Sequence, residues 1–172
     1  LEIAERDKLL RPGLVVIDLG AAPGGWSQVA RARVGTRGRV IALDMLAMEP
    51  LAGVEFLRGD FSEAAVAAAL EQTLAGRRAD LVLSDMSPNI SGIALSDQAR
   101  AMHLAELALD FAVNHLKPGG TLLVKVFQGA GFHEFLPTMR ARFGKVVTRK
   151  PEASRGRSNE LYVLGRDFSG GD

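Results

Sequence analysis

The chain has 172 residues, of which 47% are hydrophobic and 24% charged, so it is too apolar for a disordered protein and long enough for one substantial core. It contains no cysteine, which excludes a disulfide framework, a thiolate zinc site, an iron–sulfur cluster and a cysteine nucleophile. The sequence shows no signal peptide and no apolar run near the roughly 20 residues of a membrane helix. We therefore expect a cytoplasmic protein with a single domain over residues 1–172. Because the chain starts at Leu1 instead of Met, we also expect a natural N-terminal segment before it.

The net charge of +1 hides an uneven distribution of charge along the chain. Residues 1–116 carry 11 Lys and Arg against 15 Asp and Glu, a net charge of −4, whereas residues 117–172 carry 10 against 5, a net charge of +5. A basic cluster in the second part comprises Arg140, Arg142, Lys145, Arg149, Lys150, Arg155 and Arg157. Such a cluster indicates a surface for a polyanion, although a solvated basic face would give the same pattern.

Short apolar runs alternate along the chain with stretches of helical periodicity. Strands are predicted at residues 14–19, 40–44, 54–57, 81–85, 122–126, 145–148 and 161–164. Helices are predicted at residues 25–33, 63–74, 97–116 and 132–142. This alternation is typical of βαβ units, in which a parallel sheet has helices on both faces. The last two strands have only a loop between them, so we expect an antiparallel pair at one edge of the sheet.

The longest predicted helix has a clear apolar side and a clear end. Its apolar side comprises Leu104, Leu107, Ala108, Phe111 and Ala112. The Pro118-Gly119-Gly120 segment is expected to end this helix before the next strand.

The loop after the first strand is rich in glycine and precedes two acidic residues with informative spacing. It reads Asp18-Leu19-Gly20-Ala21-Ala22-Pro23-Gly24-Gly25-Trp26, which is neither the G-x-G-x-x-G of dinucleotide-binding proteins nor a phosphate-binding P-loop. Asp44 ends the second strand 24 positions after Gly20, where an acid can accept both hydroxyls of a ribose. Asp60 follows the third strand, where it could bind an adenine amino group. The pattern predicts an adenosine site without a pyrophosphate grip, which favours S-adenosylmethionine over NAD.

Four motifs resemble those of a known enzyme family. They are the Asp18–Gln28 loop, Ser84-Asp85-Met86-Ser87-Pro88-Asn89, Val124-Lys125-Val126-Phe127-Gln128-Gly129 and Lys150-Pro151-Glu152-Ala153-Ser154-Arg155. From about Glu2 to Leu164 the chain resembles the FtsJ/RrmJ family of ribose 2′-O-methyltransferases, and within it the bacterial enzymes that methylate a uridine of 23S ribosomal RNA. The resemblance implies a Rossmann-like methyltransferase fold, with a mostly parallel seven-stranded sheet, an antiparallel edge strand and helices on both faces. It also implies S-adenosylmethionine as methyl donor and a Lys-Asp-Lys-Glu catalytic tetrad.

The resemblance assigns roles to individual residues. Asp85, Lys125 and Glu160 match three of the four tetrad positions, while the first lysine would lie just before Leu1. Lys125 is by resemblance the proton acceptor; its chemistry alone also allows it to orient the hydroxyl and stabilise developing charge. The expected cofactor-binding residues are Gly24, Gly25, Trp26, Asp44, Asp60 and Asp85. Trp26 could equally anchor its helix in the core.

The same reasoning gives expectations for the partners. Arg149, Lys150, Arg155 and Arg157 are expected to bind phosphates of ribosomal RNA within the large ribosomal subunit. No metal site is expected, because the three histidines show no ligand spacing, and the protein is expected to be a monomer.

Alternative functions remain open from sequence. Transfer RNA or an mRNA cap could replace ribosomal RNA as substrate. A non-catalytic RNA-binding assembly factor could retain the fold, and an NAD-dependent oxidoreductase is disfavoured by the loop spacing. The absent cysteine disfavours methylation at pyrimidine C5, which commonly proceeds through a cysteine adduct. Asp85-Met86-Ser87-Pro88-Asn89 also lacks the Pro-Pro-aromatic pattern of amine methyltransferases.

Overall fold

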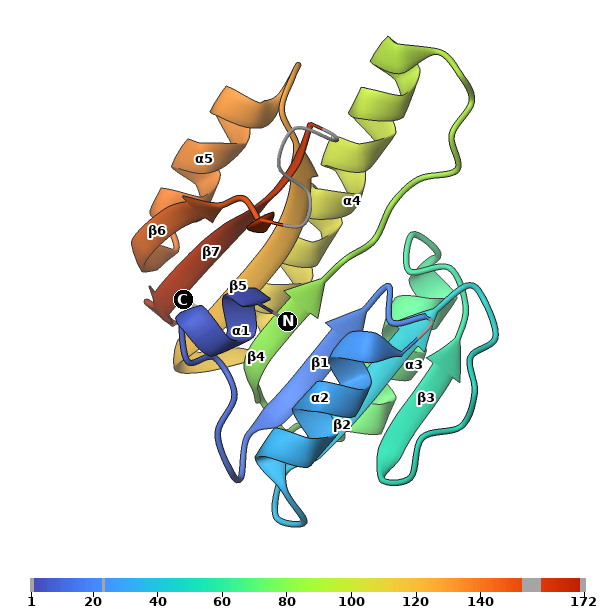
Figure 1. The fold of residues 1–172 in the computed structure, drawn as a ribbon, viewed down its shortest axis with the longest axis vertical. Coiled ribbons are helices and arrows are strands. Elements are labelled where there is room, and N and C mark those ends of the chain that lie inside the picture. The colour runs from blue at the N-terminus through green and yellow to red at the C-terminus, as the bar shows by residue number, and fades with distance from the viewer. Residues whose placement is uncertain (1, 23, 153–158, 171–172) are drawn as a thin grey trace.

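The apolar runs of the sequence form a seven-stranded sheet with helices on both of its faces (Figure 1). The computed structural model describes residues 2–22, 24–152 and 159–170. The strands are β1 (Val15–Leu19), β2 (Arg39–Asp44), β3 (Val54–Arg58), β4 (Ala79–Ser84), β5 (Leu116–Phe127), β6 (Phe143–Arg149) and β7 (Glu160–Phe168). The helices are α1 (Glu2–Arg6), α2 (Gly25–Val34), α3 (Ala64–Leu74), α4 (Ala94–His115) and α5 (Phe132–Arg140).

The strand order β3-β2-β1-β4-β5-β7-β6 places β1 near the middle of the sheet. The first five strands are parallel, while β7 lies between β5 and β6 and runs antiparallel to both. The predicted parallel sheet and the antiparallel pair at one side are therefore confirmed. Because the strand order reverses between β1 and β4, the helices that follow these two strands, α2 and α4, pack on opposite faces of the sheet, which leaves a crevice at the carboxyl ends of the strands.

Each face of the sheet has its own apolar core. All five residues of β1 are buried, as expected for a parallel strand covered on both sides. Val15, Ile17 and Leu19 pack with α3, α4 and α5, whereas Val16 packs with α1 and α2 on the other face. Figure 1 shows the two helix layers on opposite sides of the strands.

The structure corrects two details predicted for the longest helix. Leu104 and Leu107 are only partly buried, and the buried side of α4 comprises Ala101, Met102, Ala105, Ala108, Leu109, Phe111 and Ala112. The side of α4 that packs on the sheet is therefore turned from the predicted one, away from Leu104 and Leu107 and toward Ala101, Met102 and Ala105.

The end of α4 also differs from the prediction. The helix ends at His115, and Pro118-Gly119-Gly120 already belongs to β5. A proline disfavours the helical conformation of the residue before it, so the helix ends ahead of Pro118. The register between β4 and β5 shifts between Ala79 and Leu81, where the chain enters this strand.

Among the described residues, none of the helices is both long enough and apolar enough to cross a membrane.

Candidate active site

A groove of about 600 Å³ lies at the carboxyl ends of the parallel strands. Loops that follow β1, β2, β3 and β4 line it together with one side of α4 and the end of β5. Its polar lining residues include Asp44, Asp60, Ser62, Asp85, Ser87, Asn89, Arg100, His103 and Lys125. The groove therefore lies where an open α/β sheet usually binds its ligand.

Gly20 allows the loop after β1 to pass close to the loop after β4. Its φ of +77° lies in the left-handed region, and a Cβ at this position would come 2.8 Å from the backbone nitrogen of Met86. The Gly20 N–H donates to the carbonyl of Leu43 over 2.8 Å. A side chain at position 20 would push these two loops apart and fill the groove.

The carboxylates of Asp44 and Asp60 are both held in place by hydrogen bonds from loops beside the groove. Asp44 Oδ2 accepts a hydrogen bond from the Ala22 N–H over 2.9 Å, and its Oδ1 accepts one from the Leu46 N–H over 2.9 Å. Asp60 Oδ1 accepts from the Ser62 N–H over 2.9 Å and from its hydroxyl over 2.7 Å. A carboxylate has about four lone-pair positions, so each of these side chains retains acceptor capacity toward the groove.

Asp18 is the penultimate residue of β1, and its carboxyl group is fully buried. The sequence analysis assigned it no role. Its Oδ2 accepts a hydrogen bond from the Ser27 hydroxyl over 2.6 Å, while its Oδ1 has no hydrogen-bond partner within residues 2–22, 24–152 and 159–170. Burial raises the pKa of Asp18 to about 6, with the negative charges of Asp85 and Asp44 adding to this effect and the Ser27 hydrogen bond opposing it. An unpartnered buried oxygen is costly, so this position suits a ligand or solvent donor.

Lys125 and Asp85 form an ion pair at the end of the groove. Lys125 Nζ lies 3.2 Å from Asp85 Oδ1, and the lysine side chain is only 10% exposed. The ammonium group also lies 5.9 Å from the centre of the Phe127 ring. Asp85 itself is fixed because its N–H donates to the Leu19 carbonyl over 2.9 Å. These contacts hold a cationic group, with little freedom, at the wall of the groove.

Tyr162 completes this arrangement, although the sequence predicted it only as part of a strand. It lies opposite Lys125 in the β5–β7 register, and its hydroxyl donates to the same Asp85 Oδ1 over 2.8 Å. Burial raises the pKa of Tyr162 well above its usual value, and the negative charge of Asp85 and the hydrogen bond to it raise it further. The hydroxyl is therefore a permanent donor that helps to fix the Asp85 carboxylate.

Glu160 begins β7 at the same end of the sheet. It lies opposite Phe127 in the register, two residues before Tyr162, so the two side chains share one face of the sheet. The negative charge of Glu160 also contributes to the raised pKa of Tyr162. The fold thus brings together Asp85, Lys125 and Glu160, which lie far apart in the sequence.

The predicted cofactor-binding residues fall into two groups. Asp44, Asp60 and Asp85 line the groove, whereas Gly24, Gly25 and Trp26 do not. Trp26 is half-buried and packs against the apolar core on the α1 and α2 side of the sheet. The reading of Trp26 as an anchor for its helix agrees with this packing.

α4 contributes two groove residues whose placement sequence reasoning did not foresee. His103 and Arg100 line the groove one turn apart on this helix. Arg100 donates to the Asn89 carbonyl over 2.8 Å and contacts Asp97, so it ties the loop after β4 to α4. A helical periodicity identifies the polar side of α4 but does not show that this side meets a groove.

The four residues predicted to bind RNA have different surroundings. Arg149 forms a two-pronged ion pair with Asp7, with Nε–Oδ2 and Nη2–Oδ1 distances of 3.0 and 2.9 Å. Lys150 donates to the carbonyl of Glu160. Arg155 and Arg157 lie outside the described residues. Arg149 therefore has a structural partner, and the RNA-binding role of the four residues stays a prediction.

Within the described part of the chain, no three histidine, aspartate or glutamate side chains gather in a way that could hold a metal ion.

Comparison with known proteins identifies relatives of this arrangement. The family model of the FtsJ-like methyltransferases matches residues 1–168. The ribosomal RNA large subunit methyltransferase E of Azoarcus sp. is 65% identical over 168 residues, which cover 98% of this chain and 82% of that protein. A Plasmodium falciparum protein classed as a ribosomal RNA methyltransferase has a crystal structure that matches with a TM-score of 0.85 and 25% identity, covering 98% of this chain and 94% of its own.

A more distant structure shares the fold. It is a protein from Streptococcus mutans in complex with SAH, with a TM-score of 0.60 and 12% identity, covering 94% of this chain and 90% of its own. The predicted Rossmann-like methyltransferase fold is confirmed by these likenesses together with the strand order.

Proposed function

The chain belongs to the FtsJ-like methyltransferase family, and on this premise we propose that it methylates ribosomal RNA of the large subunit, at the 2′-hydroxyl of a uridine in 23S ribosomal RNA, with S-adenosylmethionine as donor. The name of the Azoarcus relative supports the substrate class, and its high identity over nearly the whole chain supports the transfer to this protein. The finer choice of a ribose oxygen rests on the lysine-centred site and on the resemblance to ribose 2′-O-methyltransferases.

The groove has features that fit an adenosyl cofactor. Asp44 has the position expected of a ribose-hydroxyl acceptor, and Asp60 that of an acceptor for an adenine amino group. Gly20 also lines the groove, and the absence of a side chain there lets the loop after β1 pass close to the loop after β4. When bound, S-adenosylmethionine supplies a methyl group on a positively charged sulfur.

The ion pair between Lys125 and Asp85 is the observation that carries the proposal. In methyl transfer to an alcohol, the bond from carbon to oxygen forms as the bond from carbon to sulfur breaks, and the hydroxyl proton must leave. Lys125 Nζ contacts the 2′-oxygen and orients it for in-line attack. After the ammonium group has released its own proton to solvent, the neutral amine accepts the hydroxyl proton as the bond from carbon to oxygen forms, and it is then again the cation that pairs with Asp85. Asp85 holds Lys125 in place, and Tyr162 holds Asp85. The loop after β1 also lacks the G-x-G-x-x-G pattern of dinucleotide-binding proteins, which favours S-adenosylmethionine over NAD.

A methylation assay on large-subunit particles tests the proposal. The full-length natural protein is incubated with labelled S-adenosylmethionine and with large-subunit particles from a strain that lacks this modification. We expect label at a uridine whose phosphodiester resists alkaline cleavage, since a 2′-O-methyl group removes the attacking hydroxyl. Lys125→Ala should lower kcat roughly 10²- to 10⁴-fold, the usual contribution of a positioned acid or base.

Lys8→Ala provides the matched control, because Lys8 is exposed and does not line the groove. This variant should keep the wild-type rate. Equal rates for wild type and Lys125→Ala would contradict the catalytic assignment, while label on a base or in an alkali-sensitive position would contradict the choice of the ribose oxygen. Tighter binding of NAD than of S-adenosylmethionine in calorimetry would contradict the proposed donor.

A further inference from the structure

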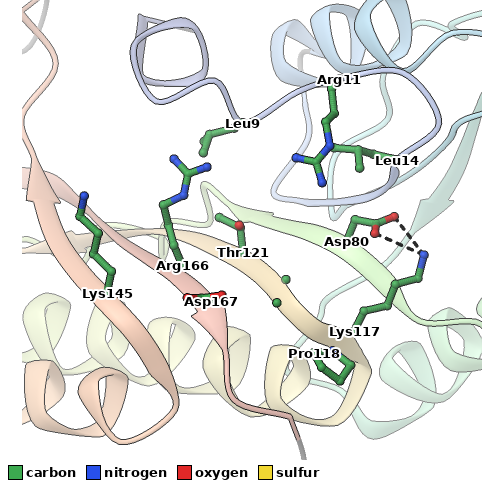
Figure 2. A pocket seen from close by; sticks show the side chains of 12 residues that line it. Leu9, Arg11, Leu14, Asp80, Lys117, Pro118, Thr121, Lys145, Arg166 and Asp167 are labelled. Atoms are coloured by element: carbon green, nitrogen blue, oxygen red, sulfur yellow. Dashed lines mark hydrogen bonds and ion pairs between the residues drawn. The ribbon is translucent and has the colours of Figure 1, made fainter.

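Figure 2 shows a second cavity, of about 440 Å³. It lies at the amino ends of the parallel strands, whereas the active-site groove lies at their carboxyl ends. The loop between α1 and β1 forms one wall, and the first residues of β5, a residue of β6 and the last residues of β7 form the other. Lys117 in this cavity and Lys125 in the groove are eight residues apart on β5, which corresponds to roughly 25 Å along a strand. The two sites are therefore separate.

Four basic side chains from different segments surround the second cavity: Arg11, Lys117, Lys145 and Arg166. Figure 2 shows Arg11 reaching from the loop toward the strands and Arg166 reaching from β7 toward the loop. One Nη of Arg166 donates to the Asp7 carbonyl over 2.6 Å, which fixes this guanidinium beside the cavity. In the part of the chain that the structure describes, Arg11 and Lys145 are exposed and have no hydrogen-bond or ion-pair partner through their side chains.

The carboxylates of this cavity do not balance its cations. Asp80 and Asp167 are the two acids that line it. Asp80 is already engaged, because it accepts a hydrogen bond from the Val15 N–H over 2.8 Å and pairs with Lys117 over 3.3 Å. Four formal positive charges thus face two negative ones. Among the described residues, Arg11 and Lys145 are the two of these cations that have no partner.

We propose that this cavity binds phosphate groups of the RNA backbone, as a second contact with the substrate. Lysine and arginine are the side chains that bind phosphate in proteins, arginine through its fork of N–H groups and lysine as a point charge. The volume falls in the range of small-ligand sites and can hold a phosphate with its neighbouring ribose. The inference rests on the proposed function, because a large folded RNA is a ligand that can reach the groove and the second cavity at once.

The salt dependence of RNA binding tests the inference with a matched pair of double variants. Arg11→Glu/Lys145→Glu reverses the two cations without partners, and Arg37→Glu/Arg77→Glu makes the same change of charge at exposed positions that do not line the cavity. Binding to an unmodified 23S ribosomal RNA transcript is measured from 0.05 to 0.3 M salt, with thermal unfolding as a check on folding. If each reversed cation had neutralised one phosphate, the slope of log K against log salt should decrease in magnitude by about 1.4 to 1.8, and affinity at 0.1 M salt should fall roughly 25- to 60-fold.

Each outcome decides for or against the inference. A smaller slope in the cavity variant alone supports it, whereas an unchanged slope, or an equal decrease in both variants, overturns it. Calorimetry with inorganic phosphate distinguishes the source of the anion: phosphate binding that Arg11→Glu/Lys145→Glu removes, with the RNA slope unchanged, would assign the cavity to a free anion and overturn the RNA contact.

The two proposals also fail in different ways. RNA binding that depends on Arg11 and Lys145 but leads to no methyl transfer would contradict the proposed function alone. Methyl transfer at the wild-type rate with an unchanged slope in the cavity variant would contradict the second contact alone.

Discussion

At the level of single residues, the Asp85 carboxylate is the centre of the candidate active site. One of its oxygens accepts a hydrogen bond from Tyr162 and pairs with Lys125. Tyr162 does not itself line the groove and, on the proposed mechanism, does not contact the reacting atoms, so we assign it a positioning role. Its effect on the reaction would pass through Asp85 to the lysine.

Tyr162→Phe separates this positioning role from packing, because phenylalanine keeps the buried ring and removes only the hydroxyl. A hydrogen bond to a charged group contributes about 1.5 kcal/mol or more, so we expect kcat to fall roughly tenfold. The KM for S-adenosylmethionine should stay at its wild-type value. Steady-state methyl transfer at several pH values, together with thermal unfolding, measures both quantities. A loss of stability with kcat unchanged would show that the hydroxyl has a structural role only.

Asp18 gives a prediction about stability and pH. Burial raises its pKa from 3.8 to about 6, so the folded state binds this proton more tightly than the unfolded state. The contribution of Asp18 to the free energy of unfolding is therefore fully present below pH 3.8 and is lost as the pH rises through 6. The difference of about two pKa units corresponds to roughly 3 kcal/mol.

Asp18→Asn should remove this dependence while keeping an acceptor for the Ser27 hydroxyl. Relative to wild type, the variant should gain up to about 3 kcal/mol in unfolding free energy between pH 4 and pH 7. Urea unfolding at several pH values measures the difference, in which other titrating groups cancel. A difference that does not vary with pH would contradict the raised pKa.

The residues that we propose to react could be predicted from the sequence more readily than those that support them. Asp85 and Lys125 are polar residues at the ends of apolar strands within recognisable motifs, so they could be predicted. Tyr162 could not, because an aromatic residue in a strand is usual and only the β5–β7 register shows that it faces Lys125. The burial of Asp18 follows from the parallel sheet, but its unpartnered oxygen depends on exact side-chain positions.

At the level of elements, α1 depends on contacts with distant parts of the chain. Its five residues are too few to form a stable helix alone. Buried Ile3 and Ala4 pack it onto the sheet, and Asp7 just after it binds Arg149 at the end of β6. The Arg149 guanidinium lowers the pKa of Asp7, so this pair stabilises the fold above pH 3.8 and loses its effect as the pH falls through the lowered value.

Arg149→Ala tests this link between the first helix and the sixth strand. The Asp7 side chain is 10% exposed, so its carboxylate would lose its partner in a partly buried position. We expect a loss of about 1 to 3 kcal/mol at pH 7, between the values for exposed and for buried ion pairs. Chemical denaturation measures it, with exposed Arg140→Ala as the control. Equal stability of the two variants would leave Arg149 available for RNA, as the sequence predicted.

No helix was predicted where α1 lies, and most ends of the other elements were predicted to within a few residues, with two instructive errors. Periodicity placed Leu104 and Leu107 in the core, but the side of α4 that packs on the sheet is turned toward Ala101, Met102 and Ala105 and leaves these leucines partly exposed. Pro118 was expected to lie between helix and strand, yet β5 begins before it, because pairing of Leu116 with Ala79 on β4 extends the strand. In both cases tertiary packing decided what local pattern could not.

At the level of the whole molecule, the uneven distribution of charge along the sequence is only partly reflected in where the charged side chains lie in the fold. The acidic residues of the first half do converge on the groove, since Asp44, Asp60 and Asp85 all line it. The described basic residues of the second half have different surroundings. Arg149 pairs with Asp7, whereas Lys145 joins Arg11 from the start of the chain at the second cavity. Charge counts along the sequence cannot show such a combination of distant segments.

The antiparallel course of β7 has a consequence for how the protein is made. During synthesis β6 leaves the ribosome before β7, yet among the described strands β6 pairs only with β7, so it has no strand to pair with until β7 follows. Tyr162 and Glu160 reach the site on that same strand. A nascent chain can therefore assemble the first five strands before β7 is made, but it acquires the candidate site residues Glu160 and Tyr162 only with this later strand.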